Sequence, residues 1–391
     1  MALSVGSCLV ECPGDFVFAP RDASSSAYAS SDRLVMTTAN LKAFTPILDS
    51  IQVVVAQVSS AIGNIFNSRP SSPLLAKATE RASQIGMELK HTGSQVIAAE
   101  EVFSAPVETL LCKTLQDYHK LIRIGAKQSV SHEVKTHSSA SSSLQLSSGL
   151  FFASLYPISK EGVRFWRFTN LIEENNLATK GVVRVPVTVP VGEETKEVIF
   201  YVTHLQAKQK AAEVRREQLA ATLGLIQNDQ RQHPQTPIFL GGDLNVTNIE
   251  DDGSKTFERN SLQTTFFSNF VDFFALDHDT FGQRTEGSCT LLYQDFMDTD
   301  REDKTGSLPE PLGSFYDPST WTPIPGCLYD YWLLHSRDPN EFRGSFAEIR
   351  RIFDAKTSSQ APLSDHLPLT VSIHLAELFS PVRIVDANDG I

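Results

Sequence analysis

The interpretation of this sequence starts from the stretch Pro237-Ile238-Phe239-Leu240-Gly241-Gly242-Asp243-Leu244-Asn245, an apolar run that ends in two glycines, an acid and an amide. Two other segments have the same form. The run Val198 to Val202 leads into Thr203-His204-Leu205-Gln206, and Ser364-Asp365-His366-Leu367-Pro368 opens an apolar run that ends at Leu375. Short apolar runs are typical of buried strands, and functional side chains gather where strands end. Two histidines and two acids in such positions predict one site assembled by the fold.

The spacing of the polar residues in the first stretch would allow them to bind one ligand together. Asp243 and Asn245 are separated by one residue, so in an extended chain their side chains point to the same side. They can share a metal ion, a phosphate oxygen or a water, and Gly241 and Gly242 allow close approach of the backbone. Gly, Asp and Asn are also turn residues, so the motif alone leaves a turn and a binding site equally open.

The two histidine clusters and Asp330 differ in how strongly each indicates a functional role. Taken alone, His204 is more typical of a buried core histidine, and Asp365-His366 is equally typical of a turn before a strand. Asp330 lies within an apolar segment from Leu328 to Trp332, where an ionised carboxylate is costly unless it is paired. An imidazole is its natural partner, because the pair fixes the tautomer and raises basicity. Two histidines, one of them oriented by a carboxylate, suit the attack of water on phosphorus beside a divalent ion.

Composition limits the class of protein. The chain has 391 residues, 41% of them hydrophobic and 20% charged, which is typical of a globular protein with one large domain or two. A net charge of −12 does not favour non-specific binding to nucleic acid, although a local basic patch or bound metals could still serve a nuclease. The five cysteines are an odd and sparse set, which predicts no disulfide framework.

The sequence also bears on membranes and location. No run approaches the roughly 18 apolar residues of a membrane span, so we expect no transmembrane segment. The short apolar stretch within residues 1–12 has no basic residue before it and is interrupted by Glu11, so we expect no signal peptide. Two locations stay open, namely secretion, or the cytoplasm and the membrane periphery.

Segments with the apolar pattern of a strand alternate along the chain with segments that have the apolar pattern of a helix. This mixture predicts α/β layers around β-sheets. We expect an irregular segment at residues 1–32 and a Ser-rich loop at 136–148. The expected strands are 33–40, 95–99, 149–153, 182–191, 198–202, 327–334 and 367–375, and the expected helices lie within 41–67, 75–90, 107–121 and 211–228.

Taken in order, these clusters resemble the endonuclease/exonuclease/phosphatase superfamily, the DNase I-like metal-dependent phosphodiesterases. The resemblance extends from Arg33 to Leu375. It implies a four-layered α/β sandwich of two packed mixed β-sheets flanked by helices. That domain would span 33–376, followed by a C-terminal tail at 377–391. The positions that match catalytic or metal-binding ones are Asn40, Glu101, His204, Asp243, Asn245, Asp330, Asp365 and His366.

Within the superfamily the chain is most similar to neutral sphingomyelinases. The segments that carry this similarity are Glu101-Val102-Phe103, Asn176 to Val182, Thr203 to Ala207, and Phe315-Tyr316-Asp317-Pro318. The resemblance implies a monomeric enzyme that uses Mg²⁺, or Mn²⁺ or Co²⁺. Its substrate would be sphingomyelin or a related phospholipid at a membrane surface, with no nucleic-acid partner. The reaction would be of the phospholipase C type, and the products would be ceramide and phosphocholine.

The resemblance also implies a role for each residue. Glu101 and Asn40 would hold the metal ion, with Asp243, Asp365 and His366 as further residues of the metal site. His366 would act as general base, oriented by Asp330 or Asp365. His204 would protonate or stabilise the leaving oxygen. Asp243 and Asn245 would position the phosphate.

Three departures keep other functions open. Glu100 stands where the superfamily usually has Gln or Asn, and residues 42–78 look like an insertion. The segment 356–360, Lys-Thr-Ser-Ser-Gln, is polar where secreted members carry an apolar docking hairpin. The alternatives are another DNase I-like hydrolase, namely a nuclease or a phosphoinositide phosphatase, and a binding module without catalysis. Tyr331 disfavours the phosphoinositide phosphatase, because a basic residue is expected at that position.

Overall fold

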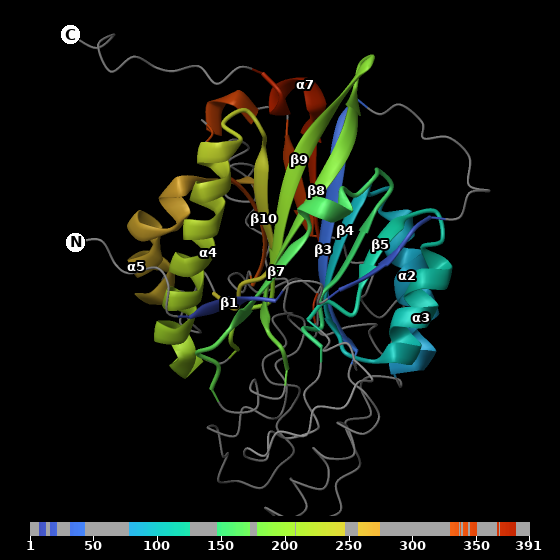
Figure 1. Ribbon diagram of the computed structural model, residues 1–391, viewed down its shortest axis with the longest axis horizontal. Coiled ribbons are helices and arrows are strands. Elements are labelled where there is room, and N and C mark those ends of the chain that lie inside the picture. Colours follow the sequence, from blue (N-terminus) through green and yellow to red (C-terminus); the bar gives the residue numbers. More distant parts are fainter. Residues whose placement is uncertain are drawn as a thin grey trace, which may run out of the picture.

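The computed structural model shows two β-sheets packed face to face between two layers of helices (Figure 1). This arrangement confirms the predicted α/β sandwich with mixed sheets. In the described part of the chain, each sheet has seven strands. The described residues are 8–12, 16–21, 32–43, 78–125, 147–172, 178–207, 209–246, 257–273, 329–335, 337, 339–342, 345–349, 366 and 368–380.

The first sheet has the order β1-β7-β8-β9-β10-β12-β11. Its centre is the parallel pair β9 and β10, flanked by the antiparallel strands β8 and β12. The bounds are β1 Leu9–Glu11, β7 Arg164–Phe168, β8 Gly181–Val191, β9 Glu194–Thr203, β10 Ile238–Asp243, β11 Phe270–Asp272 and β12 Asp330–His335.

The second sheet has the order β13-β14-β3-β4-β6-β5-β2. The parallel pair β3 and β4 forms its centre, and the other pairings are antiparallel. The bounds are β2 Val17–Ala19, β3 Arg33–Ala43, β4 Val96–Val102, β5 His119–Ile122, β6 Phe151–Ser154, β13 Phe346–Ile349 and β14 Leu369–His374.

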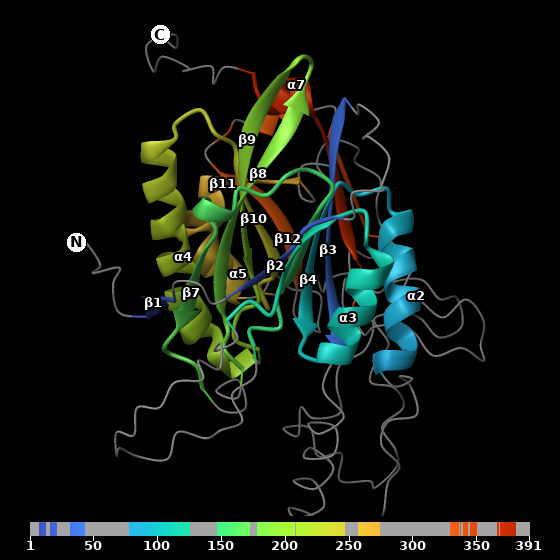
Figure 2. The ribbon, with the colours of Figure 1, turned by 45° about the vertical axis from the view of Figure 1, so that its right-hand side comes forward.

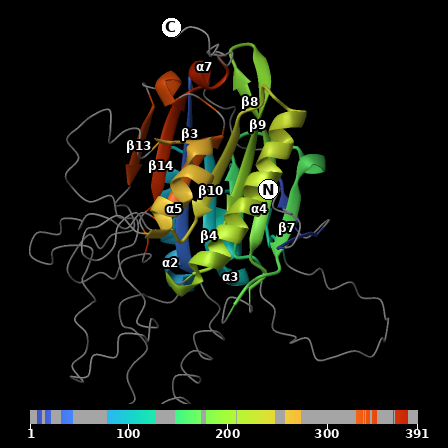
Figure 3. The same cartoon turned by 90° about the vertical axis from the view of Figure 1, so that its left-hand side faces the viewer.

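Helices cover the outer faces of both sheets. Figure 3 shows α4 and α5 in front of the first sheet, and Figure 2 brings α2 and α3 forward over the second. The bounds of the α-helices are α2 Ala78–His91, α3 Ala105–Thr114, α4 Ala212–Gln232, α5 Phe257–Thr265 and α7 Leu375–Leu378. The short 3₁₀ helices are η1 Lys160–Gly162, η3 Gln209–Ala211, η4 Phe267–Asn269 and η5 Pro339–Phe342. Among the described helices, none combines the length and the apolar character needed to cross a bilayer.

The alternation of side chains along the central strands explains the layers. In β4, Val96 and Ala98 belong to the large core between the sheets, whereas Ile97 and Ala99 belong to the core beneath α2 and α3. All four side chains are fully buried. A strand that is covered on both faces has a continuous apolar run, as the strand expected at 95–99 does.

Two expectations about secondary structure are wrong. Residues 1–32 are not uniformly irregular, because β1 pairs with β7 and β2 pairs with β5 at the edges of the two sheets. The helix expected at 107–121 ends at Thr114, and Leu121 lies in β5, which pairs with β2 and β6. These short strands are held by pairing with distant residues, so their local patterns carry little signal. Most of the expected insertion at 42–78 lies outside the described residues.

Candidate active site

Polar side chains gather at one end of the two sheets, where several strands finish. Asn40 lies near the end of β3 and Glu101 near the end of the parallel strand β4. Asp243, the last residue of β10, pairs directly with Asp330, the first residue of antiparallel β12. His204 comes directly after β9, which begins at the β8–β9 turn at the top of Figure 1. The fold therefore brings these strand ends together opposite that turn.

The backbone is irregular at this end. The β3–β4 pairing shifts register between Asn40 and Ala43, and Glu101 has a φ of 59°. Asn245, just beyond β10, has a φ of 51°. A left-handed conformation costs a non-glycine residue roughly 1–3 kcal/mol, and such strain and bulges are common beside active sites. These irregularities re-aim side chains that regular strands would direct elsewhere.

The amide of Asn40 links the two sheets. Its Nδ2 donates a hydrogen bond to Oε1 of Glu101 at 3.1 Å and another to Oδ2 of Asp243 at 3.1 Å. Asn40 and Asp243 are both buried. Carboxylate and amide oxygens are the ligands that Mg²⁺ and similar cations prefer. These three residues therefore fit a divalent cation.

His204 faces the same two carboxylates. Its Nε2 lies 3.5 Å from Oδ2 of Asp243 and 3.9 Å from Oε1 of Glu101. Burial lowers the pKa of His204 well below its usual value, and the positive charges of Lys180 and His366 lower it further. His204 is therefore a neutral imidazole, which can donate one hydrogen bond without carrying a charge.

His366 is oriented by Asp330. The distance between Nδ1 of His366 and Oδ2 of Asp330 is 2.8 Å, and Asp330 is fully buried. A carboxylate on Nδ1 fixes the tautomer in which Nε2 can accept a proton. Of the two partners expected for His366, the structure places Asp330 in contact, and Asp365 lies outside the described residues.

Negative charge is crowded at the centre of the site. Ligand atoms of Asp243, Asp330 and His366 lie within 4.8 Å of one another. Burial is the main cause that raises the pKa of Asp243 to about 6, and the negative charge of Asp330 is the second. Buried carboxylates this close repel each other unless a proton or a cation neutralises them. The electrostatics of the site therefore favour a bound cation.

Asn245 connects the carboxylate of Asp243 with the loop after His204. Its backbone N–H donates to Oδ1 of Asp243 at 2.8 Å, and its Nδ2 donates to the carbonyl of Leu205 at 3.3 Å. Both contacts hold neighbouring groups in place. The contact of Asn245 with a phosphate stays a prediction.

Glu100 belongs to the site, although sequence reasoning gave it no role. Its side chain is fully buried, and Thr38 donates to Oε1 at 3.0 Å. Within the described residues, Oε2 has no hydrogen-bond partner. Burial, and then the charges of Asp330 and Asp243, raises the pKa of Glu100 well above its usual value. The available signal was the pair of consecutive acids that ends an apolar strand.

Lys180 is a second residue to which the sequence gave no role. It is buried, and its Nζ donates to the carbonyl of Leu205 at 2.7 Å. Its charge contributes to the lowered pKa of His204. In the sequence, Lys180 belongs to the segment from Asn176 to Val182, of which Asn176 and Leu177 lie outside the described residues.

Gly242 is required by the close approach of β10 and β9. A Cβ at this position would lie 2.0 Å from the carbonyl oxygen of Thr203, and its φ is 119°. We expect Gly242→Ala to lower the free energy of unfolding by roughly 3 kcal/mol, since clash and strain add, as measured by urea denaturation. Gly192→Ala is the matched control, because Gly192 has a φ of 62° and no atom within 4 Å of a Cβ. Equal losses for the two variants would contradict the steric explanation.

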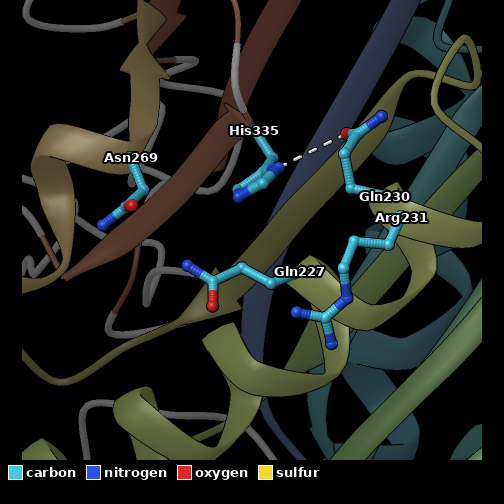
Figure 4. Close-up of a pocket in the computed structure, with 5 residues that line it drawn as sticks. All are labelled: Gln227, Gln230, Arg231, Asn269 and His335. Carbon is cyan, nitrogen blue, oxygen red and sulfur yellow. Dashed lines mark hydrogen bonds between the residues drawn. The ribbon is translucent and has the colours of Figure 1, made fainter.

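A shallow polar hollow lies elsewhere, away from this cluster. It has a volume of about 310 Å³ and is lined by Gln227, Gln230, Arg231, Asn269 and His335 (Figure 4). His335 is the last residue of β12, at the opposite end of the strand from Asp330. The hollow therefore lies apart from the candidate active site and contains none of its residues.

Comparison with solved structures supports the same fold. The chain is similar to sphingomyelinase C from Streptomyces griseocarneus, with a TM-score of 0.55, 15% sequence identity, and coverage of 87% of this chain and 99% of that one. It is also similar to a double mutant of beta toxin from Staphylococcus aureus with bound magnesium ions. For that protein the TM-score is 0.52 and the identity 17%, with 86% of this chain and 98% of that one covered.

These likenesses define the class of fold. The two packed mixed sheets with flanking helices are the DNase I-like fold, as the sequence predicted. No protein-family model matches the sequence, and no curated protein has significant sequence similarity to it. What the chain does must therefore be argued from the site itself.

Proposed function

We propose that this protein is a metal-dependent phosphodiesterase that hydrolyses sphingomyelin to ceramide and phosphocholine, a phospholipase C-type reaction at a membrane surface. The observation that carries the proposal is the opposition of two histidines across one acidic cluster. His366 is paired with Asp330 at 2.8 Å, and His204 is neutral and lies 3.5 Å from Asp243. The choice of sphingomyelin is supported by the sequence segments that resemble neutral sphingomyelinases and by the likeness in fold to the Streptomyces enzyme.

The cation in this proposal is Mg²⁺, with Mn²⁺ or Co²⁺ as substitutes. The carboxylates of Glu101 and Asp243 already converge on Nδ2 of Asn40, and they offer the oxygen ligands that such an ion prefers. Asn40 would add its amide oxygen when the ion is bound. His366 is a less suitable ligand for Mg²⁺, because this ion prefers oxygen ligands and the free Nε2 of His366 is needed to accept a proton from water. When bound there, a divalent ion would neutralise charge on the phosphate.

The residues divide the chemistry between them. Nε2 of His366 takes a proton from water while the water oxygen bonds to phosphorus. The bond from phosphorus to the ceramide oxygen breaks, and the Nε2–H of His204 donates a hydrogen bond to that leaving oxygen. The oxygen then takes a proton from a water molecule to become the hydroxyl of ceramide, and the proton held by His366 neutralises the hydroxide that remains. Asn245 helps to place the phosphate. Asp330 keeps His366 in the tautomer that accepts the proton.

A substrate comparison tests the proposal. We expect purified protein to release phosphocholine from sphingomyelin vesicles in Mg²⁺, and to lose this activity in EDTA and regain it when Mg²⁺ is restored. Plasmid DNA and an inositol phosphate are assayed in parallel under the same conditions. Cleavage of DNA or of the inositol phosphate with sphingomyelin intact would favour a nuclease or a phosphoinositide phosphatase. If none of the three substrates is turned over in any of the three metals, the phosphodiesterase assignment fails.

A further inference from the structure

The two site histidines are held in different ways. The ring of His366 is oriented by Asp330 through a hydrogen bond to Nδ1. The corresponding Nδ1 of His204 is buried and makes no hydrogen bond with any described residue. A carboxylate or carbonyl on the second nitrogen is the usual means of fixing a functional imidazole. The position of His204 must therefore come from the backbone that carries it.

The residue after His204 is fixed on both of its backbone groups. The N–H of Leu205 donates to the carbonyl of Asp243 at 3.0 Å. Its carbonyl accepts from Nζ of Lys180 at 2.7 Å and from Nδ2 of Asn245 at 3.3 Å. These three bonds therefore join the His204 loop to residues of the candidate site.

Gln206 is fixed from the opposite side, by helix α4 and the segment before residue 173. Its backbone N–H donates to Oε1 of Gln218 at 3.1 Å, and its carbonyl accepts from Nη1 of Arg215 at 2.9 Å. Its side chain forms two bonds with the backbone of Ile172, accepting at 3.2 Å and donating at 3.3 Å. Gln206 is fully buried. Its backbone and side-chain polar groups are thus all engaged, and the loop has little freedom.

The helix residues that hold Gln206 are costly to bury. Arg215 is 1% exposed, and Glu258 of α5 binds its guanidinium at 2.8 and 2.6 Å. A buried ion pair seldom repays its desolvation, and apolar residues of similar volume often stabilise a protein more. Arg215 and Gln218 are three residues apart, so they lie on the same face of α4. The hydrogen bonds that Arg215 and Gln218 make to Gln206 explain their presence there better than helix packing does.

We propose that Gln206, Arg215 and Gln218 are positioning residues, which form an anchor that keeps Nε2 of His204 directed at the leaving oxygen. The inference rests on the proposed function, because it gives this anchor a place in the same reaction. All three side chains are buried, so in this role none of them needs to contact the substrate. They act through the loop that follows His204, whose Nδ1 makes no hydrogen bond with any described residue.

The first test compares leaving groups. Gln218→Met and Gln206→Met remove hydrogen bonds while keeping side-chain length. We expect kcat for sphingomyelin to fall roughly 10–100-fold, because small misplacements of a catalytic group are that costly. With p-nitrophenyl phosphocholine, whose leaving oxygen needs no assistance, we expect kcat to stay within about 3-fold. His204→Ala should show the same dependence on the leaving group. Equal losses on both substrates would overturn the inference.

Tyr201→Phe is the matched control for a general loosening of α4. Tyr201 lies on β9, three residues before His204, and its hydroxyl donates to Asp229 of α4 at 2.8 Å. This variant removes that bond, and the longer one of 3.5 Å to the carbonyl of Leu225 on the same helix, without touching the anchor. We expect both substrates to be turned over as by the wild type. A leaving-group effect as large as that of Gln218→Met would contradict a role specific to the anchor.

A second readout does not depend on turnover. The imidazole resonances of isotope-labelled histidine are assigned with His204→Ala and His366→Ala in the folded protein. We expect Gln218→Met and Gln206→Met to shift or broaden the His204 resonance while leaving that of His335 unchanged. An unchanged His204 resonance in both variants would overturn the anchor. If the wild type turned over neither substrate, the proposed function would fail, whereas the resonances would still decide whether the anchor positions His204.

Discussion

Replacing His366 with alanine is expected to lower kcat for sphingomyelin by about 10²–10⁴-fold, the usual contribution of a general base. The imidazole lies in the site with Nδ1 held by Asp330 at 2.8 Å, so Nε2 is the nitrogen that can accept a proton from water. Alanine removes the base and leaves the buried carboxylate of Asp330 without this partner. Steady-state rates in saturating Mg²⁺ measure the effect, and circular dichroism establishes that the variant is folded.

A second histidine provides the control for this loss. His335 is buried on β12, the same strand that carries Asp330, and its ring packs edge-on against Phe270 at a centroid distance of 5.4 Å. We expect His335→Ala to lower stability and to leave kcat at the wild-type value, because His335 is the last residue of β12 and Asp330 is the first. Near-normal turnover by His366→Ala would remove His366 from the role of base. A comparable loss in His335→Ala would show that the effect is structural.

Asp330→Asn tests the pairing rather than the base. An amide can donate to Nδ1 and so hold the wrong tautomer, with the proton on Nε2. We expect a loss of kcat of roughly 10²-fold or more, with the substrate KM less affected, because binding does not need the tautomer. A pH–rate curve of Asp330→Asn that superimposes on that of the wild type would separate Asp330 from His366.

The sequence predicted the parts of the site that local pattern carries. The runs that end in His204 and Asp243 predicted buried strands, and the ends of parallel neighbours such as β9 and β10 meet at one edge of a sheet. Asp330 stood out because it is an acid within an apolar segment, and its expected imidazole partner lies 2.8 Å away. These inferences needed only the cost of burying charge and the period of a strand.

Other parts depend on contacts that no local pattern records. The role of Glu100 depends on its burial against Asp243 and Asp330, which come from the opposite sheet. Lys180 reaches the carbonyl of Leu205 across 25 residues. The left-handed φ of Glu101 and the register shift in β3 cannot be inferred from residue types that favour regular strands. Sequence reasoning therefore predicted most residues of the candidate site and missed Glu100 and Lys180, whose burial and contacts depend on residues far away in the sequence.

Glu100 is expected to make the stability of the protein depend on pH. We expect the free energy of unfolding of the metal-free protein to fall as pH rises above the unfolded-state pKa of about 4.3, by up to 1.4 kcal/mol per pH unit. The reason is the sign of its shift. Burial raises the folded-state pKa of Glu100, so the folded protein retains a proton that the unfolded chain has already released. The contribution of Glu100 to the free energy of unfolding is fully present below its unfolded-state pKa. It decreases as the pH rises from that value to the folded-state pKa.

Glu100→Gln removes this dependence, because glutamine is neutral at every pH and can still accept the 3.0 Å bond from Thr38. Urea denaturation in EDTA from pH 4 to pH 8 should give a flatter curve for the variant and a higher free energy of unfolding at pH 8. Glu108→Gln is the control, since Glu108 is buried but accepts from Nε of Arg123 at 3.0 Å, and its loss should destabilise the protein. The superfamily that this chain resembles usually carries an amide at the position of Glu100, which is the same exchange. Parallel curves for the wild type and Glu100→Gln would mean that Glu100 is ionised in the folded protein, balanced by charge that the metal-free site still holds.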